Sequence, residues 1–310
     1  AGTIGFGLAP RINAAGRLER AMRAVEMLTT DDATLAERIA DELDEVNRRR
    51  QEVEREIFRQ ATEQIRSEGG LNDRGAIVLG RQGWHPGVIG IVASRMVETY
   101  HRPTILVAFG EEFAQGSGRS IPGFNLYDAI HQCSEGLIGF GGHSAAAGVR
   151  MSADHFPVFA ERFDARCRGL MTPELRERVL NIDAEVPLAT LDLRTVEELE
   201  KLEPHGMGNP RPVFLASRAR VVGEPRVVGA DQKHLQLKLG QGNAVVKAIA
   251  WGLAEKGKGL AHDAELDAVF SPSINEWNGY RSVQLEIKDF LVADVPASAA
   301  APATVAAVGA

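Results

Sequence analysis

The sequence has 310 residues, of which 44% are hydrophobic, and a formal net charge of −7. These values predict a globular protein of two or three domains with well-filled cores. No run of about 18 apolar residues is present to span a bilayer, and the first residues lack the basic and apolar regions of a signal peptide, so we expect a cytoplasmic protein. Two cysteines, Cys133 and Cys167, are too few for a disulfide framework, and we interpret them as packing residues.

The negative net charge argues at first against a nucleic-acid partner, because phosphate binding usually appears as a basic balance. The charges are unevenly distributed, however. Residues 206–293 contain 11 basic and 9 acidic side chains, which makes this segment net positive. Such a small excess is weak evidence, since a charge count is usually only a solvated surface.

The chain begins with a Gly-rich apolar stretch that is typical of the interior of a domain, so we interpret it as a fragment and residues 1–30 as the end of a preceding domain. Residues 31–70 are predicted to form a long helix. Apolar side chains recur three or four residues apart from Leu35 to Ile65, and Thr34 with Glu37 forms a candidate capping box. We expect a strut between two domains rather than a packed core helix.

Residues 71–170 are predicted to form an α/β domain with a mixed sheet. Strands are expected at 75–80 and 102–110 around a helix at 87–100, an order that favours a parallel pair. The segment 116–123 is predicted to be a glycine-rich loop, 125–137 a helix and 140–151 a loop leading into another helix or strand. An amphipathic helix over 154–170 completes the domain.

The rest of the chain changes character. Residues 171–205 are acidic and contain three prolines, so we expect a connector. Residues 206–293 alternate polar and apolar side chains between tight turns, which favours an OB-fold barrel. The Ala-rich residues 294–310 are expected to be disordered. The predicted fold class is therefore α/β plus all-β. A long helix connects residues 1–30 to the α/β domain, and the barrel follows.

Four short motifs combine glycines with polar or cationic tips, a pattern that suits a phosphate group because arginine forks, hydroxyl groups and helix N-termini all stabilise anions. They are RINAAGRL (11–18), GWHPGVIG (83–90), GSGRS (116–120) and GGHS (141–144). The candidate residues are Arg11, Asn13, Arg17, His85, Ser117, Arg119, Ser120, Gly141, Gly142, His143 and Ser144.

Each motif also has an ordinary structural interpretation. For His85 and His143, a core or turn histidine is favoured over a ligand, and GSGRS is equally consistent with a solvent loop. Four barrel aromatics favour core packing over base stacking: Trp251, Trp277, Tyr280 and Phe290. We find neither a nucleophile–base–acid triad nor a carboxylate and histidine cluster with two-metal spacing. These residues indicate how a phosphate is held, and give no sign of how one is cleaved.

The same stretches resemble the RecJ family of single-strand-specific 5′→3′ DNA exonucleases in the DHH phosphoesterase superfamily. The resemblance is collinear over about residues 1–293 and rests on GLAPRINAAGRL, QGWHPGVIGIVASRM, GSGRSIPGFNLYDAI, GFGGHSAAAG, EPHGMGNPRPVF and KHLQLKL. It implies a DHHA1 domain at 71–170 and an OB-fold at 206–293. No DHH motif is present ahead of the long helix, so hydrolysis by this chain alone is in doubt.

The resemblance also implies roles. His143 is the catalytic candidate, with Gly141 and Gly142 at the scissile phosphate, while Ser117, Arg119 and Ser120 would bind the 5′ end. Mn²⁺ or Mg²⁺ would bind to a DHH segment that precedes this one, and no metal to this chain. We expect a monomer that binds single-stranded DNA in repair and recombination, with a single-stranded-DNA-binding protein or a helicase as further partners.

Two other functions stay open at this stage. The chain is also consistent with a single-stranded-DNA-binding module that has no catalytic role. It is also consistent with a DHH-superfamily phosphoesterase for small nucleotides, although a C-terminal barrel disfavours this because a small substrate has no strand to thread.

Overall fold

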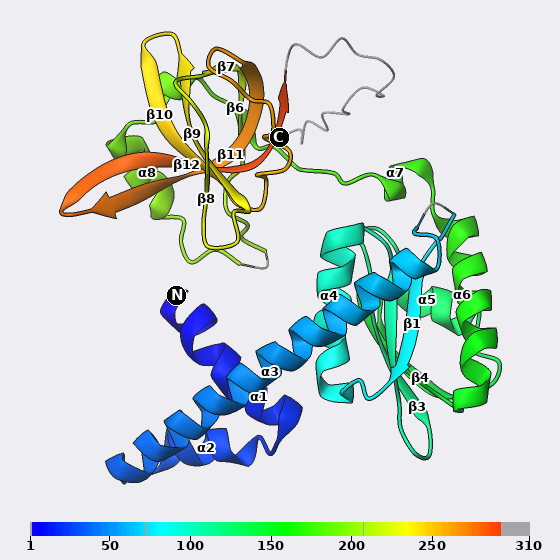
Figure 1. Ribbon diagram of the computed structural model, residues 1–310. Coiled ribbons are helices and arrows are strands. Elements are labelled where there is room, and N and C mark those ends of the chain that lie inside the picture. Colours follow the sequence, from blue (N-terminus) through cyan, green and yellow to red (C-terminus); the bar gives the residue numbers. More distant parts are fainter. Residues whose placement is uncertain (1, 72, 207, 293–310) are drawn as a thin grey trace. The chain divides into compact units, whose positions relative to one another are not determined.

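A computed structural model describes residues 2–71, 73–206 and 208–292 (Figure 1). The chain divides into two compact units, Ala1–Arg178 and Val179–Ala310. The tail predicted to be disordered, 294–310, lies outside the described residues. No helix among those residues is both long and apolar enough to cross a membrane.

The first unit begins with a set of helices: η1 (Thr3–Leu8), α1 (Ala9–Leu18), α2 (Met22–Thr29) and the long α3 (Ala33–Ser67). The predicted capping box at Thr34 is wrong by two residues. Asp32 is the N-cap of α3, and its carboxylate accepts hydrogen bonds from the backbone N–H groups of Thr34 at 2.9 Å and Leu35 at 3.1 Å. An ionised carboxylate at this position also interacts favourably with the positive end of the helix dipole.

The long helix α3 contributes to two cores, so it is more than the exposed strut that the sequence suggested. Ile39 and Leu43, in its first half, pack against α1 and α2. In its second half, Ile57, Ala61 and Ile65 pack against α4 and the sheet. Because these residues recur at helical spacing, one stripe of α3 is buried along most of its length.

The first unit also contains a five-stranded mixed sheet with the order β1-β2-β3-β5-β4. Its strands are β1 (Ile77–Gln82), β2 (Thr104–Phe109), β3 (Ala114–Arg119), β4 (Leu137–His143) and β5 (Ala146–Met151). The predicted parallel pairing of β1 with β2 is confirmed, and the other pairings are antiparallel. Helix α4 (Pro86–Tyr100) connects the parallel strands and packs with α3 on one face.

Four short segments complete the first unit: α5 (Leu126–His131), η2 (Ala153–His155), α6 (Phe156–Leu170) and α7 (Pro173–Arg176). Helices α5 and α6 pack on the face of the sheet opposite α4, where Phe159 and Phe163 are fully buried. Cys133 and Cys167 are free and lie in this core, as packing residues. Burial raises the pKa of the Cys167 thiol.

The predicted glycine-rich loop at 116–123 is largely wrong, because its first four residues lie in strand β3, between β2 and β5. A Cβ atom at Gly116 would lie 2.5 Å from Val149 Cγ2, so glycine is needed there for close packing between strands. The glycines that suggested a mobile loop therefore allow a tightly packed sheet.

The prediction that 140–151 is a loop leading into a helix or strand is partly confirmed, because its second half is strand β5. The loop and the helix are wrong: β4 and β5 form an antiparallel hairpin whose turn contains Ser144 and Ala145. The GGHS motif therefore presents a hairpin end, and no helix dipole is directed at a ligand here.

The second unit is a seven-stranded sheet with the order β6-β7-β11-β12-β10-β9-β8, and an additional β7–β9 pairing closes it into a barrel. Its strands are β6 (Ala184–Glu185), β7 (Phe214–Val221), β8 (Arg226–Val228), β9 (His234–Gln241), β10 (Ala244–Ala250), β11 (Glu265–Trp277) and β12 (Tyr280–Val292). Short helices η3 (Leu188–Thr190) and α8 (Leu193–Glu200) precede β7. Hence part of the segment predicted as a connector, 171–205, pairs with and packs on the barrel.

The barrel aromatics differ from the core assignment favoured by the sequence. Phe290 is in the core, with 2% of its surface exposed. Three others are exposed, Trp251 by 57%, Trp277 by 73% and Tyr280 by 82%. Trp277 and Tyr280 lie opposite each other at the end of the β11–β12 hairpin, where the turn carries them beyond the hydrophobic interior.

Candidate anion and nucleic-acid site

Three elements of the first unit bring cationic and hydroxyl groups together. Arg17 lies near the end of α1, and Ser117 and Arg119 lie on β3 beside the start of α4. Arg119 Nη1 donates to Ser117 Oγ at 3.2 Å and to the Gly118 carbonyl at 2.7 Å. We call Arg17, Ser117 and Arg119 the arginine cluster.

Two glycines in the first turns of α4 allow this convergence. A Cβ atom at Gly90 would lie 2.9 Å from Ser117 Oγ and 3.0 Å from Arg119 Nη2. A Cβ atom at Gly87 would lie 2.1 Å from the Arg17 carbonyl oxygen, and Arg17 Nη1 approaches the Gly87 carbonyl at 3.4 Å. Any larger residue would therefore push α1 or the β3 side chains away from the helix start.

The arginine cluster is electrostatically unbalanced. The Arg119 side chain is half-buried, and burial together with the nearby charge of Arg17 lowers its pKa. Among the described residues, the groups bonded to these two guanidinium groups are the neutral oxygens of Gly87, Ser117 and Gly118, with no carboxylate. Two arginines beside a helix N-terminus, without a counter-ion from the chain, form a site that favours an anion.

The hairpin of β4 and β5 extends the same face of the sheet. Arg119 pairs with Ala146, which pairs with His143, so the three residues form one row across the strands. Paired residues of antiparallel strands project to the same face, which places His143 and Arg119 on one side, with Cα atoms about 10 Å apart. In the next row, Ser117 pairs with Gly148 and Gly148 with Gly141.

This row of glycines forms a low floor between Arg119 and His143. A Cβ atom at Gly141 would meet nothing within 4 Å, and at Gly148 only the Gly116 carbonyl at 3.8 Å. Packing within the chain thus does not require glycine at either position. The floor instead leaves the backbone open to close approach by another molecule.

Two segments of the chain match known protein families. The family model described as DHHA1 domain matches residues 73–169, and the model described as RecJ OB domain matches residues 182–289. The chain thus contains one segment similar to a DHHA1 domain and, after it, a second segment similar to the RecJ OB domain. This confirms the resemblance found in the motifs.

The curated relatives are single-stranded-DNA-specific exonucleases named RecJ. The chain is 35% identical to the Bacillus subtilis protein over 94% of its own length and 37% of the relative's. It is 31% identical to the Escherichia coli protein over 93% of its own length and 51% of the relative's. The chain thus spans between about a third and a half of the length of these relatives.

Solved structures agree with this assignment. The crystal structure of RecJ in complex with Mn²⁺ from Thermus thermophilus matches with a TM-score of 0.79 and 35% identity, covering 94% of this chain and 42% of that one. A crystal structure of exonuclease RecJ bound to manganese matches 57% of this chain, and 43% of that one, with a TM-score of 0.51 and 38% identity. The predicted fold class is confirmed.

Within residues 73–169, the hydroxyl and imidazole groups predicted as phosphate ligands differ in how far they are engaged in hydrogen bonds within the chain. The Ser120 hydroxyl donates to the Phe124 carbonyl at 2.8 Å, so it closes the loop after β3. His85 is the N-cap of α4, and its Nδ1 accepts from the Gly87 N–H at 3.1 Å. His143 Nδ1 accepts from the Ala145 N–H at 3.3 Å, and its ring is exposed. Ser144 is also exposed, at the hairpin turn.

The residues predicted on α1 separate into two groups. Arg11 forms an ion pair with Asp44 of α3 and donates to the Gly7 carbonyl at 2.6 Å, so its charge is used within the helices. Asn13 is exposed and lies one turn before Arg17, on the same side of α1. The structure therefore brings Arg17 to Ser117 and Arg119, and leaves Arg11 engaged elsewhere.

Sequence reasoning missed the roles of Gly87, Gly90 and Gly148. The spacing of Gly87 and Gly90 was a usable signal, because two glycines three residues apart share one face of a helix and allow close packing there. Gly148 could not be selected from the sequence, since its place beside Ser117 and Gly141 depends on strand register.

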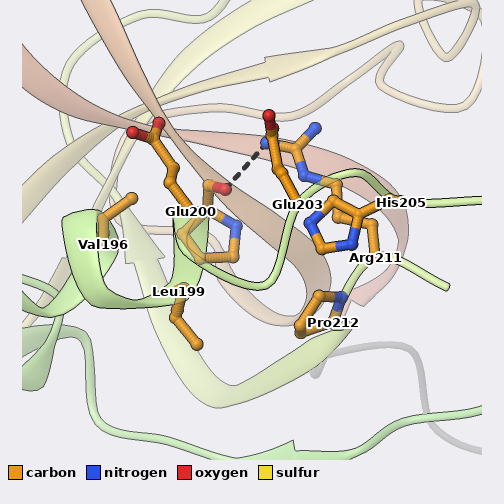
Figure 2. Close-up of a pocket in the computed structure, with 8 residues that line it drawn as sticks. Val196, Leu199, Glu200, Glu203, His205, Arg211 and Pro212 are labelled. Atoms are coloured by element: carbon orange, nitrogen blue, oxygen red, sulfur yellow. Dashed lines mark hydrogen bonds between the residues drawn. The ribbon is translucent and has the colours of Figure 1, made fainter. Parts of the chain in front are cut away.

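Two other hollows suit an anion less well. One, of about 410 Å³, lies at the ends of β1 and β2 and includes Glu111 and Glu112, whose charges repel a phosphate. The other, of about 20 Å³, lies between α8 and β11 and has room for one water at most (Figure 2). In the turn beside it, the Asn209 side chain donates to the Leu202 and Pro204 carbonyls, so this amide has a structural role.

Proposed function

We propose that this chain is the nucleic-acid-binding part of a RecJ-like single-stranded-DNA 5′→3′ exonuclease that acts in DNA repair and recombination. It would position the 5′ end and the scissile phosphodiester for a metal centre in another part of the full-length protein. The arginine cluster is the observation that carries this proposal, because Arg17 and Arg119 are held beside α4 with no counter-ion among the described residues.

In the DHHA1 domain, Arg119 and Ser117 would bind the phosphate at the 5′ end, with Arg17 on the opposite side. The planar guanidinium group offers two parallel donors to phosphate oxygens, and the hydroxyl group offers a third. From there the bound DNA strand would continue over the floor formed by Gly141 and Gly148. There the exposed imidazole of His143 would donate to the scissile phosphate and stabilise the charge that develops on it.

In the OB domain, exposed aromatic rings would stack on bases of the trailing strand. Trp277 and Tyr280 fit this role because both rings are largely exposed at one hairpin end. Stacking is tolerant of sequence, since every base has a π-face. The two domains would thus divide the work between recognition of an end and retention of a strand.

A divalent metal ion would supply Lewis-acid chemistry at the phosphodiester. Relatives of known structure are described as complexes with Mn²⁺ or Mg²⁺. Within the residues that the structure describes, no group of three or more His, Cys, Asp or Glu side chains is arranged to hold a metal ion. The described residues do not fit the metal, and we propose that its ligands would lie in a DHH segment outside this chain.

We further propose that the chain is a cytoplasmic monomer and that its partners include a single-stranded-DNA-binding protein or a helicase. Sedimentation of the purified chain would test the oligomeric state. Pull-down with each candidate partner, with and without DNA, would separate direct contact from bridging by the strand.

The central test is binding and hydrolysis by the purified chain. We expect it to bind a labelled single strand without releasing nucleotides, with or without Mn²⁺. Preference for a 5′-phosphate over a 5′-hydroxyl would support end recognition, whereas equal affinity for both ends would favour a simple binding module. Metal-dependent release of nucleotides by a preparation free of nuclease would show that catalytic residues do lie on this chain.

A further inference from the structure

The lysines of this chain are distributed very unevenly. All seven lie after residue 200, and the preceding basic residues are arginines. Five of them form ion pairs with nearby carboxylates: Lys201, Lys233, Lys256, Lys258 and Lys288. Among the described residues, Lys238 and Lys247 have no such partner.

These two lysines, which we call the lysine pair, lie directly opposite each other on β9 and β10. Both are exposed, while their neighbours Leu237, Leu239, Val246 and Ala248 are buried in the barrel core, so the ammonium groups share its outer face. Like charges on directly opposed residues destabilise a sheet. The fold therefore carries a local repulsion, and no carboxylate of the described residues lies within ion-pair distance of either ammonium group.

On the neighbouring strand, β12, the residue next to the lysine pair carries no charge. Lys247 pairs with Gln284 of β12. Two residues further along β12 lies Glu286, but its carboxylate accepts from Arg211 Nη1 at 2.9 Å. The nearest carboxylate on this strand is therefore already engaged by an arginine.

The same face leads to the exposed aromatic rings. Along β12, Gln284, Ser282 and Tyr280 are two residues apart and so project to one side, and Trp277 lies opposite Tyr280. From Gln284 to Tyr280 the strand rises about 14 Å. One face of the OB domain thus combines two exposed rings with two cations that have no ion-pair partner among the residues that the structure describes.

We propose that the lysine pair contacts neighbouring phosphates of a single-stranded nucleic acid whose bases stack on Trp277 and Tyr280. This rests on the proposed function, because it names the surface of the OB domain that would hold the strand. A bound backbone supplies the counter-charge that the sheet lacks. The aromatic rings favour a nucleic acid over an anionic lipid surface or an acidic protein segment, since unpaired bases offer flat partners for stacking.

The first test compares affinity for a long single strand at several salt concentrations, using the full chain with Lys238→Gln, Lys247→Gln and both together. Each lysine that neutralises one phosphate contributes about 0.7 to the slope of log affinity against log salt, which corresponds to about fivefold in affinity at 0.1 M salt. We expect the double variant to lose about 25-fold and to have a slope smaller by about 1.4. Strands with a 5′-phosphate and a 5′-hydroxyl should lose equally.

Lys233→Gln and Lys258→Gln are matched controls, because they remove the same charge from lysines that are ion-paired in the OB domain. We expect them to change affinity by less than about twofold. Losses equal to those of the lysine pair would show that only overall charge matters, and would overturn the proposal.

A second measurement needs no ligand. Removing one member of the lysine pair relieves repulsion, so Lys238→Gln should raise the urea concentration at the midpoint of unfolding, whereas Lys233→Gln should not. If the wild-type chain binds single strands and the double variant binds them with the same affinity, the role assigned to the lysine pair is overturned. The proposed function would stand in that case. A wild-type chain that binds no single strand would overturn the proposed function as well.

Discussion

The arginine cluster and the lysine pair present similar charges in opposite settings. Arg17 and Arg119 are partly enclosed, and the Arg119 fork is fixed by Ser117 and the Gly118 carbonyl. Lys238 and Lys247 project from an open sheet on flexible stems. A fixed, half-buried fork discriminates between ligand geometries, whereas exposed ammonium groups respond mainly to charge and are strongly screened by salt. Under the proposed function, this difference would let the arginine cluster recognise the end of a strand and the lysine pair retain the rest of it.

The strongest challenge to this comparison is Arg119→Ala. We expect a loss of about 1.5–3 kcal/mol in binding a strand with a 5′-phosphate, the scale of a hydrogen bond to a charged group, and a much smaller loss with a 5′-hydroxyl. Folding stability should change by no more than about 0.5 kcal/mol, because relief of repulsion from Arg17 offsets the lost hydrogen bonds. Titration of both oligonucleotides at one salt concentration measures the difference.

Arg81→Ala is the matched control, since Arg81 is an exposed arginine on β1 of the same sheet. An equal loss for the two strand ends would assign only general charge to Arg119. If affinity for either strand stayed at the wild-type value, GSGRS would have no binding role.

The aromatic pair of the OB domain should show the opposite selectivity. Trp277→Ala and Tyr280→Ala are each expected to weaken binding of a long strand by about 1–2 kcal/mol, within the usual range for stacking on one base, whichever group is at the 5′ end. Fluorescence anisotropy with strands of increasing length provides the measurement. Leu291→Ala, which removes an apolar side chain that is 61% exposed on β12, is the control and should have little effect. Loss restricted to the 5′-phosphorylated strand would contradict the division between the domains.

Gly90→Ala tests whether close packing shapes the arginine cluster. The added methyl group would displace Ser117 Oγ and Arg119 Nη2, so we expect about 1 kcal/mol of lost affinity for the 5′-phosphorylated strand. Thermal unfolding should show equal or higher stability, because alanine is favoured over glycine within a helix by up to about 1 kcal/mol. Gly169→Ala in α6, where a methyl group meets nothing within 4 Å, should stabilise the protein without altering binding. Unchanged affinity in Gly90→Ala would mean that the packing at α4 does not shape the site.

The smallest effect on binding is expected for Asp32→Ala. Loss of this N-cap should lower the free energy of unfolding by about 1 kcal/mol, because two backbone N–H groups of α3 lose their acceptor. Both sites should keep their affinity, since Asp32 contacts neither. Urea unfolding and strand binding, measured on the same preparation, separate the two quantities. If strand affinity fell together with the free energy of unfolding, the affinity losses of the other variants could reflect reduced global stability instead of lost contacts at the two sites.

Periodicity predicted much of this fold. The long helix α3 and the parallel β1 and β2 follow from apolar spacing, and most barrel strands follow from alternation. Strand β3 was missed because its glycines are favoured in turns when considered locally, while neighbouring strands decide its conformation.

The candidate site was only partly visible in the sequence. Ser117 and Arg119 could be selected because a hydroxyl and a guanidinium group between glycines suit a phosphate, but their distance from Arg17 depends on how α1 meets α4. Likewise, alternation could not decide whether Trp277 and Tyr280 were core residues, since they lie at a strand end where the hairpin leaves the barrel. The lysine pair required strand register, which the sequence leaves open.

The confinement of lysines to the second unit means that chemical acylation can separate the two sites without mutagenesis. Reagents that convert side-chain amines to amides remove the charges of Lys238 and Lys247 and leave every guanidinium group intact. A strand bound beforehand would shield those two amines, and peptide mass spectrometry would locate the protected positions. In the unmutated protein, the acylated form should still distinguish a phosphorylated end from a hydroxyl end while losing its hold on the strand behind it.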